Sequence, residues 1–463
     1  MNAVDRIRGR QVGILGMARS GMAAALLAKR LGSKPFVSDA ADRETLLDRT
    51  NVLDEQAIPY ETGGHTPLLM ESDFLVLSPG VPLDIGILSR AHELGIPFFS
   101  EIEFASWVCQ GRIVAITGSN GKTTTTTLAG EIFNAAGFDT VVCGNIGRPF
   151  ADIADRVSES AVVMLEVSTY QLETIADFRP HVAAILNLTP DHLQRHGSFE
   201  KYKQAKYRIT ENQEPDDYLV LNREDVELDA ARIESKAIKR FFSATNSVDS
   251  CAFVRDGRLQ IRDIDRAKSI VEAAKICIPG PHNLQNAAAA VCIASLFDID
   301  VQIMGSVLRS FKGVEHRLES VGSVAGIRFI NDSKATNVES VCYALRSIEP
   351  SVYLIMGGQD KGSSYTPIIT HGRGRIAGIV VIGEARQKIF EALGRDFAVE
   401  FAPSLEDAVA LCFDRARPGD TVLLSPGCAS FDMFDDFEHR GRAFKEAVAS
   451  LKNGKNNSET VSN

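Results

Sequence analysis

The sequence lacks the marks of a disulfide-stapled, zinc-binding or membrane-spanning protein. Its eight cysteines lie far apart, without a CxxC pair or zinc-finger spacing, so we expect reduced thiols. No run of about 18 uninterrupted apolar residues occurs. No separate apolar signal segment precedes the first expected strand. We therefore expect a cytoplasmic protein without membrane insertion.

An excess of positive charge is also missing, since 50 Lys and Arg stand against 60 Asp and Glu, a formal net charge of -10. We therefore expect no nucleic-acid partner held by bulk electrostatics, although local basic pockets around anionic substrates remain compatible with this balance. The length of 463 residues suggests about three domains.

Short apolar runs alternate with polar or helix-forming stretches, which is typical of parallel α/β sheets. We expect a first domain at residues 1–108, a central domain at 109–311 and a third, doubly wound domain at 312–463. The expected strands are VGILG, PFVSD, FLVLSPG and IPFFS in the first domain, RIVAIT, AVVMLEVS, HVAAILNL and YLVLN in the second, and GIRFIND, VYLIMGG, GIVVIG, VEFAPS and TVLLSPG in the third.

The segment VAITGSNGKTTTT, residues 114–126, places Gly118, Gly121, Lys122 and Thr123 between an expected strand and an expected helix. Backbone N–H groups of such a loop can surround phosphate oxygens, while the lysine reaches the terminal phosphates and a hydroxyl reaches magnesium. The usual phosphate loop has a further glycine where this chain has Ile116. A helix-starting turn that merely uses glycine is the alternative.

Three more residues of the central domain could act near a bound triphosphate: Glu166 and His192, each after a strand-like run, and Lys206 downstream. A carboxylate and an imidazole could complete magnesium coordination. Each taken singly is more often structural, as a hydrogen-bonded histidine or a solvated glutamate.

In the third domain, NDSKATN, GGQDKG and SPGCASFDMFDDFEHRG each follow an expected strand. Ligands of open α/β sheets bind at the carboxyl ends of strands. Lys334 and Lys361 could there meet a carboxylate, and Ser430 could offer a hydroxyl. Solvated surface lysines and ordinary turn residues are the alternative.

The first domain has Gly13, Gly16 and Gly21 after its first strand, a poor match to the G-x-G-x-x-G fingerprint of a nicotinamide site. A diphosphate at the helix N-terminus near Arg19 remains physically reasonable, together with the SPG turn that begins at Ser78.

Ten motifs in order resemble the Mur ligase family across nearly the whole chain. They are TGSNGKTT, GNIG, LEVSTYQLE, NLTPDHLQRHGS, YKQAKYRI, HNLQNAAAA, EHRLE, NDSKATN, GGQDKG and SPGCASFDMF. The resemblance implies an α/β fold of three domains: a Rossmann-like N-terminal domain for the UDP part of the substrate, a central P-loop ATPase-type domain, and a Rossmann-like C-terminal domain for the amino acid. Among members, the motifs are most similar to those that add D-glutamate to UDP-N-acetylmuramoyl-L-alanine, using ATP and Mg²⁺, with two ions expected.

The resemblance also implies roles for individual residues. Lys122, Glu166, His192 and Lys206 would be catalytic, and Thr123, Glu166, His192 and Lys206 would hold the metal, with Lys206 carried as a carbamate. ATP would be bound by Gly118, Ser119, Asn120, Gly121, Lys122, Thr123, Thr124, Asn283, Asn286, Arg317 and Asp332. The acceptor substrate would meet Arg19, Ser20, Ser78, Asn145, Gln171 and His192, and glutamate would meet Lys334, Thr336, Lys361, Ser430 and Phe437.

One departure from the family motifs and one missing motif bear on the substrate. Where some relatives carry threonine and arginine to hold the uracil, this chain has Ala40 and Ala41. The Asp-Asn-Pro-Arg motif of diaminopimelate-adding relatives is missing, which favours glutamate.

Several alternatives stay open. They are another Mur step, an L-glutamate-adding variant and a folylpolyglutamate synthase-like enzyme. A regulator that had lost catalysis would be expected to lack Lys122, Glu166 or Lys206, and this chain has all three. We expect a monomer.

Overall fold

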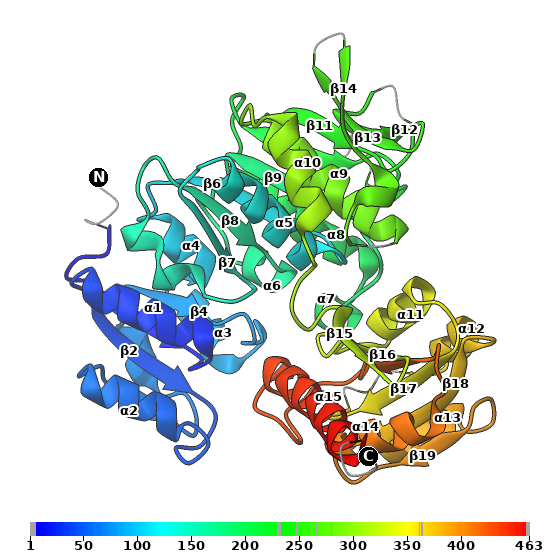
Figure 1. Cartoon of the computed structure of the whole chain (residues 1–463). Helices are drawn as coiled ribbons and strands as arrows, with labels where there is room; N and C mark the ends of the chain where they lie inside the picture. Colours follow the sequence, from blue (N-terminus) through cyan, green and yellow to red (C-terminus); the bar gives the residue numbers. More distant parts are fainter. Residues whose placement is uncertain are drawn as a thin grey trace. The chain divides into compact units, whose positions relative to one another are not determined.

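The computed structural model describes residues 6–228, 233–246, 249–263, 266–278, 280–360, 362 and 364–459. The chain separates into two compact units, one formed by Met1–Cys277 with Pro281–Phe311 and the other by Ile278–Gly280 with Lys312–Asn463. The first unit contains two sheets and the second contains one (Figure 1). Over the described residues, no helix has the length and apolar character needed to cross a bilayer.

The first sheet has five parallel strands in the order β3-β2-β1-β4-β5. Every residue of β4 is buried, as expected for a strand covered on both faces. Ser100 begins a helix as its N-cap by accepting the backbone N–H of Glu103. The elements are β1 (Gln11–Leu15), α1 (Arg19–Arg30), β2 (Lys34–Asp39), α2 (Leu47–Glu55), β3 (Tyr60–Thr62), η2 (Pro67–Glu71), β4 (Phe74–Leu77), α3 (Gly86–Glu93), β5 (Phe98–Ser100) and α4 (Glu101–Ser106).

The second sheet has nine strands in the order β14-β13-β12-β11-β10-β9-β6-β8-β7. The strands from β7 to β12 pair in parallel, and β12, β13 and β14 form an antiparallel meander. Its strands are β6 (Arg112–Thr117), β7 (Thr140–Gly144), β8 (Val162–Glu166), β9 (Val182–Ile185), β10 (Tyr218–Asn222), β11 (Ile238–Phe242), β12 (Ala252–Arg255), β13 (Arg258–Asp263) and β14 (Arg266–Glu272). Its helices are α5 (Lys122–Ala135), η3 (Phe150–Asp152), η4 (Ala154–Arg156), α6 (Thr169–Leu172), α7 (Leu193–His196), α8 (Phe199–Tyr207), η5 (Arg208–Thr210), η6 (Ala273–Lys275), α9 (Pro281–Ser295) and α10 (Val301–Ser310).

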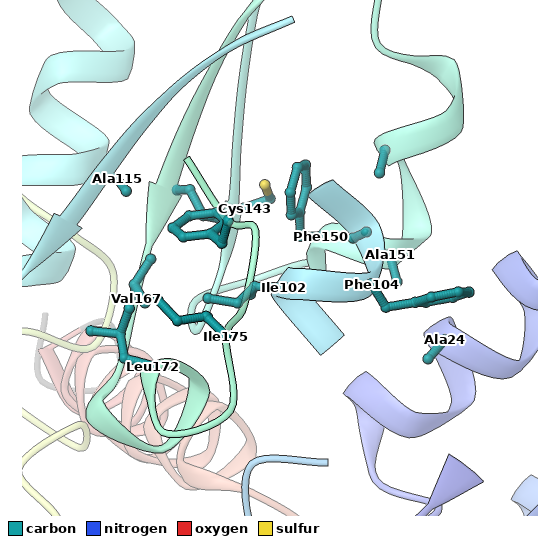
Figure 2. Packing of buried hydrophobic residues seen from close by; sticks show 14 of the residues in the cluster. Ala24, Ile102, Phe104, Ala115, Cys143, Phe150, Ala151, Val167, Leu172 and Ile175 are labelled. Atoms are coloured by element: carbon teal, nitrogen blue, oxygen red, sulfur yellow. The ribbon is translucent and has the colours of Figure 1, made fainter. Parts of the chain in front are cut away.

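These two sheets share one continuous hydrophobic cluster. Figure 2 shows Phe104 of α4 between Ala24 of α1 on one side and Phe150 and Ala151 of η3 on the other, with Cys143 of β7 beyond them. All five side chains are 0% exposed. Because apolar burial of this kind is the main stabilising contribution in folding, the shared cluster holds the two sheets of the first unit together.

The third sheet has six strands in the order β15-β16-β20-β17-β18-β19, with β15 antiparallel and the other pairs parallel. Apolar clusters on both faces bury the central strands, as in doubly wound sheets. The elements are β15 (Glu319–Val324), β16 (Ile327–Asn331), α11 (Val338–Ser347), β17 (Val352–Gly357), α12 (Pro367–Gly372), β18 (Ile376–Ile382), α13 (Arg386–Leu393), β19 (Val399–Phe401), α14 (Leu405–Arg415), β20 (Thr421–Leu424) and α15 (Phe437–Glu459).

The predicted α/β fold class is confirmed, with three sheets in which parallel pairs predominate. Each of the thirteen apolar runs used in the prediction contains a strand or most of one. The domain boundaries at 108/109 and 311/312 stay predictions.

Candidate active site

The predicted phosphate loop lies between β6 and α5, the strand-to-helix setting that such a loop requires. Gly121 is the N-cap of α5 and has a φ of 81°, a left-handed conformation that favours glycine. A Cβ at this position would lie 2.2 Å from Oδ1 of Asn286, so side-chain space also requires glycine. Asn286 accepts a hydrogen bond from Thr125 Oγ1 at 3.3 Å and donates one to Asn283 Oδ1 at 3.1 Å. Asn286, predicted to bind ATP, therefore lies against the loop and is hydrogen-bonded to Asn283, the second asparagine of that prediction.

The loop is held by the segment that follows β9, which the sequence analysis did not single out. Asn187 accepts from the backbone N–H of Asn120 at 2.7 Å and donates to its carbonyl at 3.0 Å. Ser119 Oγ lies 2.9 Å from the carbonyl of Thr189 and 2.8 Å from the hydroxyl of Tyr202. Asn187 and Thr189 belong to the motif NLTPDHLQRHGS, and Tyr202 belongs to the motif YKQAKYRI. Only the fold brings these motifs to the loop.

Two lysines converge on one carbonyl of the loop. Lys122 Nζ donates to the Gly118 oxygen at 2.8 Å, and Lys206 Nζ donates to the same oxygen at 2.9 Å. Lys206 is only 2% exposed. Burial, with the nearby charge of Lys122 acting in the same direction, holds the pKa of Lys206 well below its ordinary value. Lys206 is therefore biased toward the neutral amine.

Glu166 ends β8 beside the loop and is 1% exposed. Its Oε1 accepts a hydrogen bond from Asn145 Nδ2 at 2.8 Å, whereas its Oε2 is buried and has no hydrogen-bond partner among the described residues. A buried carboxylate oxygen without a donor is costly unless a cation meets it. Since Mg²⁺ prefers oxygen ligands, Glu166 fits the predicted role of metal ligand.

His192 has a φ of 51° and precedes the short helix α7. Its Nδ1 lies 2.9 Å from the Tyr170 hydroxyl, and its Nε2 lies 3.5 Å from Oδ2 of Asp191. Its side chain is about half exposed. A metal bond from His192 would have to replace one of these two contacts.

Gln171 has a structural role in this chain. Its Oε1 accepts the backbone N–H of Ser168 at 3.0 Å, while Ser168 Oγ accepts the backbone N–H of Gln171, so the two residues form a capping box at α6. Gln171 is 1% exposed. Gln171 also hydrogen-bonds the buried Glu101 carboxyl through its side chain, so both ends of its side-chain amide have partners within the protein.

In the first sheet, the loop before α1 is held by Asp39, whose carboxylate accepts the backbone N–H groups of Met17 and Ala41. Ser78, which directly follows β4, donates its hydroxyl hydrogen to the Gly16 carbonyl at 3.0 Å. This hydrogen bond connects the end of β4 to the same loop. Arg19 is exposed at the start of α1 with Ser20 after it, and its Nη1 lies 3.5 Å from the Gly147 carbonyl. These contacts define a loop at a helix N-terminus, where an anion can be bound.

In the second unit, Asp332 follows β16 and is 2% exposed. It accepts from Ser425 Oγ at 2.9 Å and from the backbone N–H of Leu318 at 3.2 Å. Burial raises the pKa of its carboxyl to about 6, although the positive charge of Arg317 opposes this shift.

Arg440, which was not predicted from the sequence, joins two loops that carry residues assigned to glutamate, the loop of Lys334 and the loop of Ser430. Arg440 is 1% exposed and donates to the Ser333 carbonyl and hydroxyl and to the carbonyls of Cys428 and Ala429. Ser430 follows directly and is 2% exposed.

The ammonium of Lys334 lies 5.6 Å from the centre of the Phe437 ring, which brings these two together in the same unit. Thr336 donates its backbone N–H to the Lys334 carbonyl. Lys361 lies outside the described residues.

Chemically, the first unit offers a loop of backbone donors at a helix N-terminus, a lysine, and a buried carboxylate oxygen without a hydrogen-bond donor. Together they define a nucleotide-binding α/β protein of the phosphate-loop type.

Three family models match successive segments of this chain. The Mur ligase middle domain matches residues 116–294, the glutamate ligase domain of Mur ligases matches 316–428, and the MurD N-terminal domain matches 11–85. The chain is 43% identical to a UDP-N-acetylmuramoylalanine--D-glutamate ligase of Koribacter versatilis, over 96% of this chain and 98% of that protein. It is 42% identical to the protein of the same name from Acidobacterium capsulatum, over 96% of each chain.

Solved structures share the fold at low identity. A MurC ligase of Thermotoga maritima has a TM-score of 0.62 at 18% identity, covering 96% of this chain and all of that one. A MurF ligase of the same organism, in complex with ADP, has a TM-score of 0.58 at 16% identity, covering 97% of each chain. The chain belongs to the Mur ligase family, and the family prediction from the sequence is confirmed.

Proposed function

We propose that this chain joins D-glutamate to UDP-N-acetylmuramoyl-L-alanine at the expense of ATP, in the cytoplasmic synthesis of peptidoglycan precursors. The proposal is supported by about 40% sequence identity, over 96% of this chain, to proteins named UDP-N-acetylmuramoylalanine--D-glutamate ligase. The observation that carries its chemistry is the grouping of Lys122, Lys206 and the buried Glu166 carboxylate around one phosphate loop. We further propose three working domains, for the UDP substrate at 1–108, for ATP at 109–311 and for glutamate at 312–463, acting as a monomer.

The reaction has two steps. First, the alanyl carboxylate oxygen attacks the γ-phosphorus of ATP, the bond to the β-γ bridging oxygen breaks, and an acyl phosphate and ADP result. Lys122 and the backbone N–H groups at the start of α5 stabilise negative charge on the transferring group. Next, the neutral amine of glutamate attacks the acyl carbon, and the tetrahedral intermediate collapses to the amide with loss of phosphate and a proton.

Magnesium would be held by Glu166 and Thr123, with His192 and a modified Lys206 completing the sites of two ions. When bound, Mg²⁺ neutralises phosphate charge and orients the γ-phosphoryl group. The unpartnered Oε2 of Glu166 supports this assignment. Asn145 fixes the carboxylate by its hydrogen bond to Oε1, and we propose that it also contacts the muramoyl group.

A carbamate on Lys206 is consistent with the geometry. The amine is buried, and its pKa is held well below the ordinary value by burial and by Lys122. A neutral amine can attack carbon dioxide and release a proton, which leaves an anionic oxygen ligand in its place. Such an anion would be stabilised by the positive charge of Lys122 beside it.

The residues that would bind the UDP group, ATP and D-glutamate are assigned from their positions in the family motifs. Arg19, Ser20 and Ser78 would hold the UDP part, and Asn283, Asn286, Arg317 and Asp332 would hold the nucleotide of ATP. Lys334, Thr336, Lys361, Ser430 and Phe437 would hold D-glutamate, because a small dianionic amino acid needs cations and donors on both carboxylates.

ADP release by the purified full chain tests this function. With ATP, Mg²⁺ and UDP-N-acetylmuramoyl-L-alanine, release is expected to depend on D-glutamate and to stay at background with L-glutamate, other amino acids or none. Release that depends on another amino acid would overturn the proposed specificity. Release that depends on another acceptor would overturn the proposed acceptor.

A further inference from the structure

Two cysteines meet beside a cavity that the proposed reaction does not use. The cavity has a volume of about 950 Å³ and is lined from β11, β13 and the end of α9, together with Cys251 just before β12. These elements lie in the part of the first unit that carries the meander (Figure 1). Cys292 lies on α9 and is 0% exposed, whereas Cys251 is partly exposed.

Two shared neighbours fix the contact between these cysteines. The backbone N–H of Cys251 donates to the Phe241 carbonyl at 2.7 Å, and the Cys292 thiol donates to the same oxygen at 3.9 Å. The hydroxyl of Ser295 lies 3.3 Å from Cys251 Sγ and donates to the Cys292 carbonyl at 2.7 Å. Cys251, just before β12, and Cys292 on α9 therefore share two neighbours, although they lie about 40 residues apart in the sequence.

The surroundings favour a thiolate at Cys251 and a protonated thiol at Cys292. The hydrogen bond with Cys292 lowers the pKa of Cys251 to about 6, helped by Ser295 and by the charges of Arg240 and Arg262, while burial opposes the shift. Burial and the same hydrogen bond raise the pKa of Cys292 well above its ordinary value. Among the described residues that line the cavity, four are basic and three, Asp249, Asp298 and Asp300, are acidic.

The same cavity contains an unsatisfied donor. Arg262 stacks its guanidinium 5.0 Å from the centre of the Phe253 ring, and its buried Nε has no hydrogen-bond partner in the part of the chain that the structure describes. The positive charge of Arg262 also favours an anionic sulfur at Cys251.

We propose that Cys251 and Cys292 form a redox pair, in which a small hydroperoxide entering the cavity oxidises Cys251 and Cys292 then closes a disulfide with it. This modification lies outside the ligase reaction and does not depend on the proposed function.

The two steps balance. The Cys251 thiolate attacks one oxygen of hydrogen peroxide, the O–O bond breaks, and a sulfenic acid and hydroxide result. The Cys292 thiol then attacks the Cys251 sulfur, the S–O bond breaks, and the hydroxyl leaves with the Cys292 proton as water. The two thiols lose two electrons in total, and the peroxide is reduced to two waters.

The test uses the full-length, reduced protein treated with one equivalent of hydrogen peroxide, with remaining thiols blocked by N-ethylmaleimide before intact-mass measurement and peptide mapping. We expect a loss of two hydrogens and a cross-linked peptide pair containing Cys251 and Cys292, reversed by dithiothreitol. Cys292→Ser should instead accumulate a sulfenic acid at Cys251 that reacts with dimedone. Cys277→Ser is the matched control, because Cys277 is an exposed cysteine of the same unit, and it should form the same disulfide as the wild type.

Mapping of the wild-type protein alone can overturn the proposal, so no variant has to fold for the test to decide. If peroxide oxidises Cys277 while Cys251 and Cys292 both stay reduced in the folded protein, the pair is not a redox site. A disulfide that joins Cys251 to a different cysteine would equally refute the assignment of Cys292.

Discussion

Replacing Gly121 by alanine should destabilise the first unit and weaken ATP binding together. The left-handed backbone at φ 81° costs an alanine about 1–2 kcal/mol. The new Cβ would also lie 2.2 Å from Asn286 Oδ1, so Asn286 must move and its contacts with Thr125 and Asn283 weaken. Two such hydrogen bonds are worth about 1 kcal/mol each. If both hydrogen bonds are lost, the total loss is about 3–4 kcal/mol, with a raised KM for ATP.

The variant Gly137→Ala is a matched control that separates the cost of backbone strain from the cost of displacing Asn286. Gly137 has a φ of 86°, but a Cβ there would meet nothing within 4 Å, so Gly137→Ala should cost only the strain of about 1–2 kcal/mol and leave the KM for ATP unchanged. Both losses can be read from urea unfolding followed by Trp107, the single tryptophan, which packs against Phe74 and Phe104 in the first unit. If Gly121→Ala lost no more stability than Gly137→Ala and kept its KM for ATP, the placement of Asn286 against the loop would be refuted.

Four other variants test the site and its electrostatics. Lys122→Ala should lose at least about a hundredfold in turnover at saturating ATP while the fold survives, because a stabiliser of the transferring phosphoryl group is removed. Lys206→Ala should be nearly inactive and partly rescued by short carboxylic acids, which restore an oxygen ligand; full activity of the variant would exclude the carbamate role. Ser430→Ala should raise the KM for D-glutamate more than the KM for ATP, and equal changes in both constants would argue against the glutamate pocket. Glu101 is 0% exposed, and burial raises the pKa of its carboxyl to about 7. The folded state therefore binds the proton more tightly, so stability of the first unit should fall as pH rises from about 4.5 to 7, by roughly 3 kcal/mol from this group. Glu101→Gln should remove that loss when unfolding is compared at pH 5 and pH 8.

Most of the parallel strands were predictable because their apolar runs are short, bounded and buried on both faces, as in β4, β9 and β20, whereas the parallel strands β3 and β7 were not predicted. The strands β11 to β14 were missed, because the alternating polar residues of strands such as β11, with its exposed Ile238 and Arg240, give no continuous apolar run. A half-exposed meander has to be recognised from its turns instead, here at Gly257.

The site was predictable where one segment carries the chemistry, as in the loop from Gly118 to Lys122. What the sequence could not supply are the contacts between segments that lie far apart along the chain. The convergence of Lys122 and Lys206 on one carbonyl, the grip of Asn187 on Asn120 and the position of Asn286 all depend on tertiary packing. Arg440 was missed for the same reason, since its role arises from burial among distant carbonyls.

The most direct test of the central claim is the amino-acid dependence of ADP release by the purified chain with ATP, Mg²⁺ and UDP-N-acetylmuramoyl-L-alanine. With D-glutamate we expect stoichiometric ADP and a new amide product, and with L-glutamate or no amino acid we expect background release. Release that proceeds equally without D-glutamate, or that requires a different amino acid, would contradict this claim.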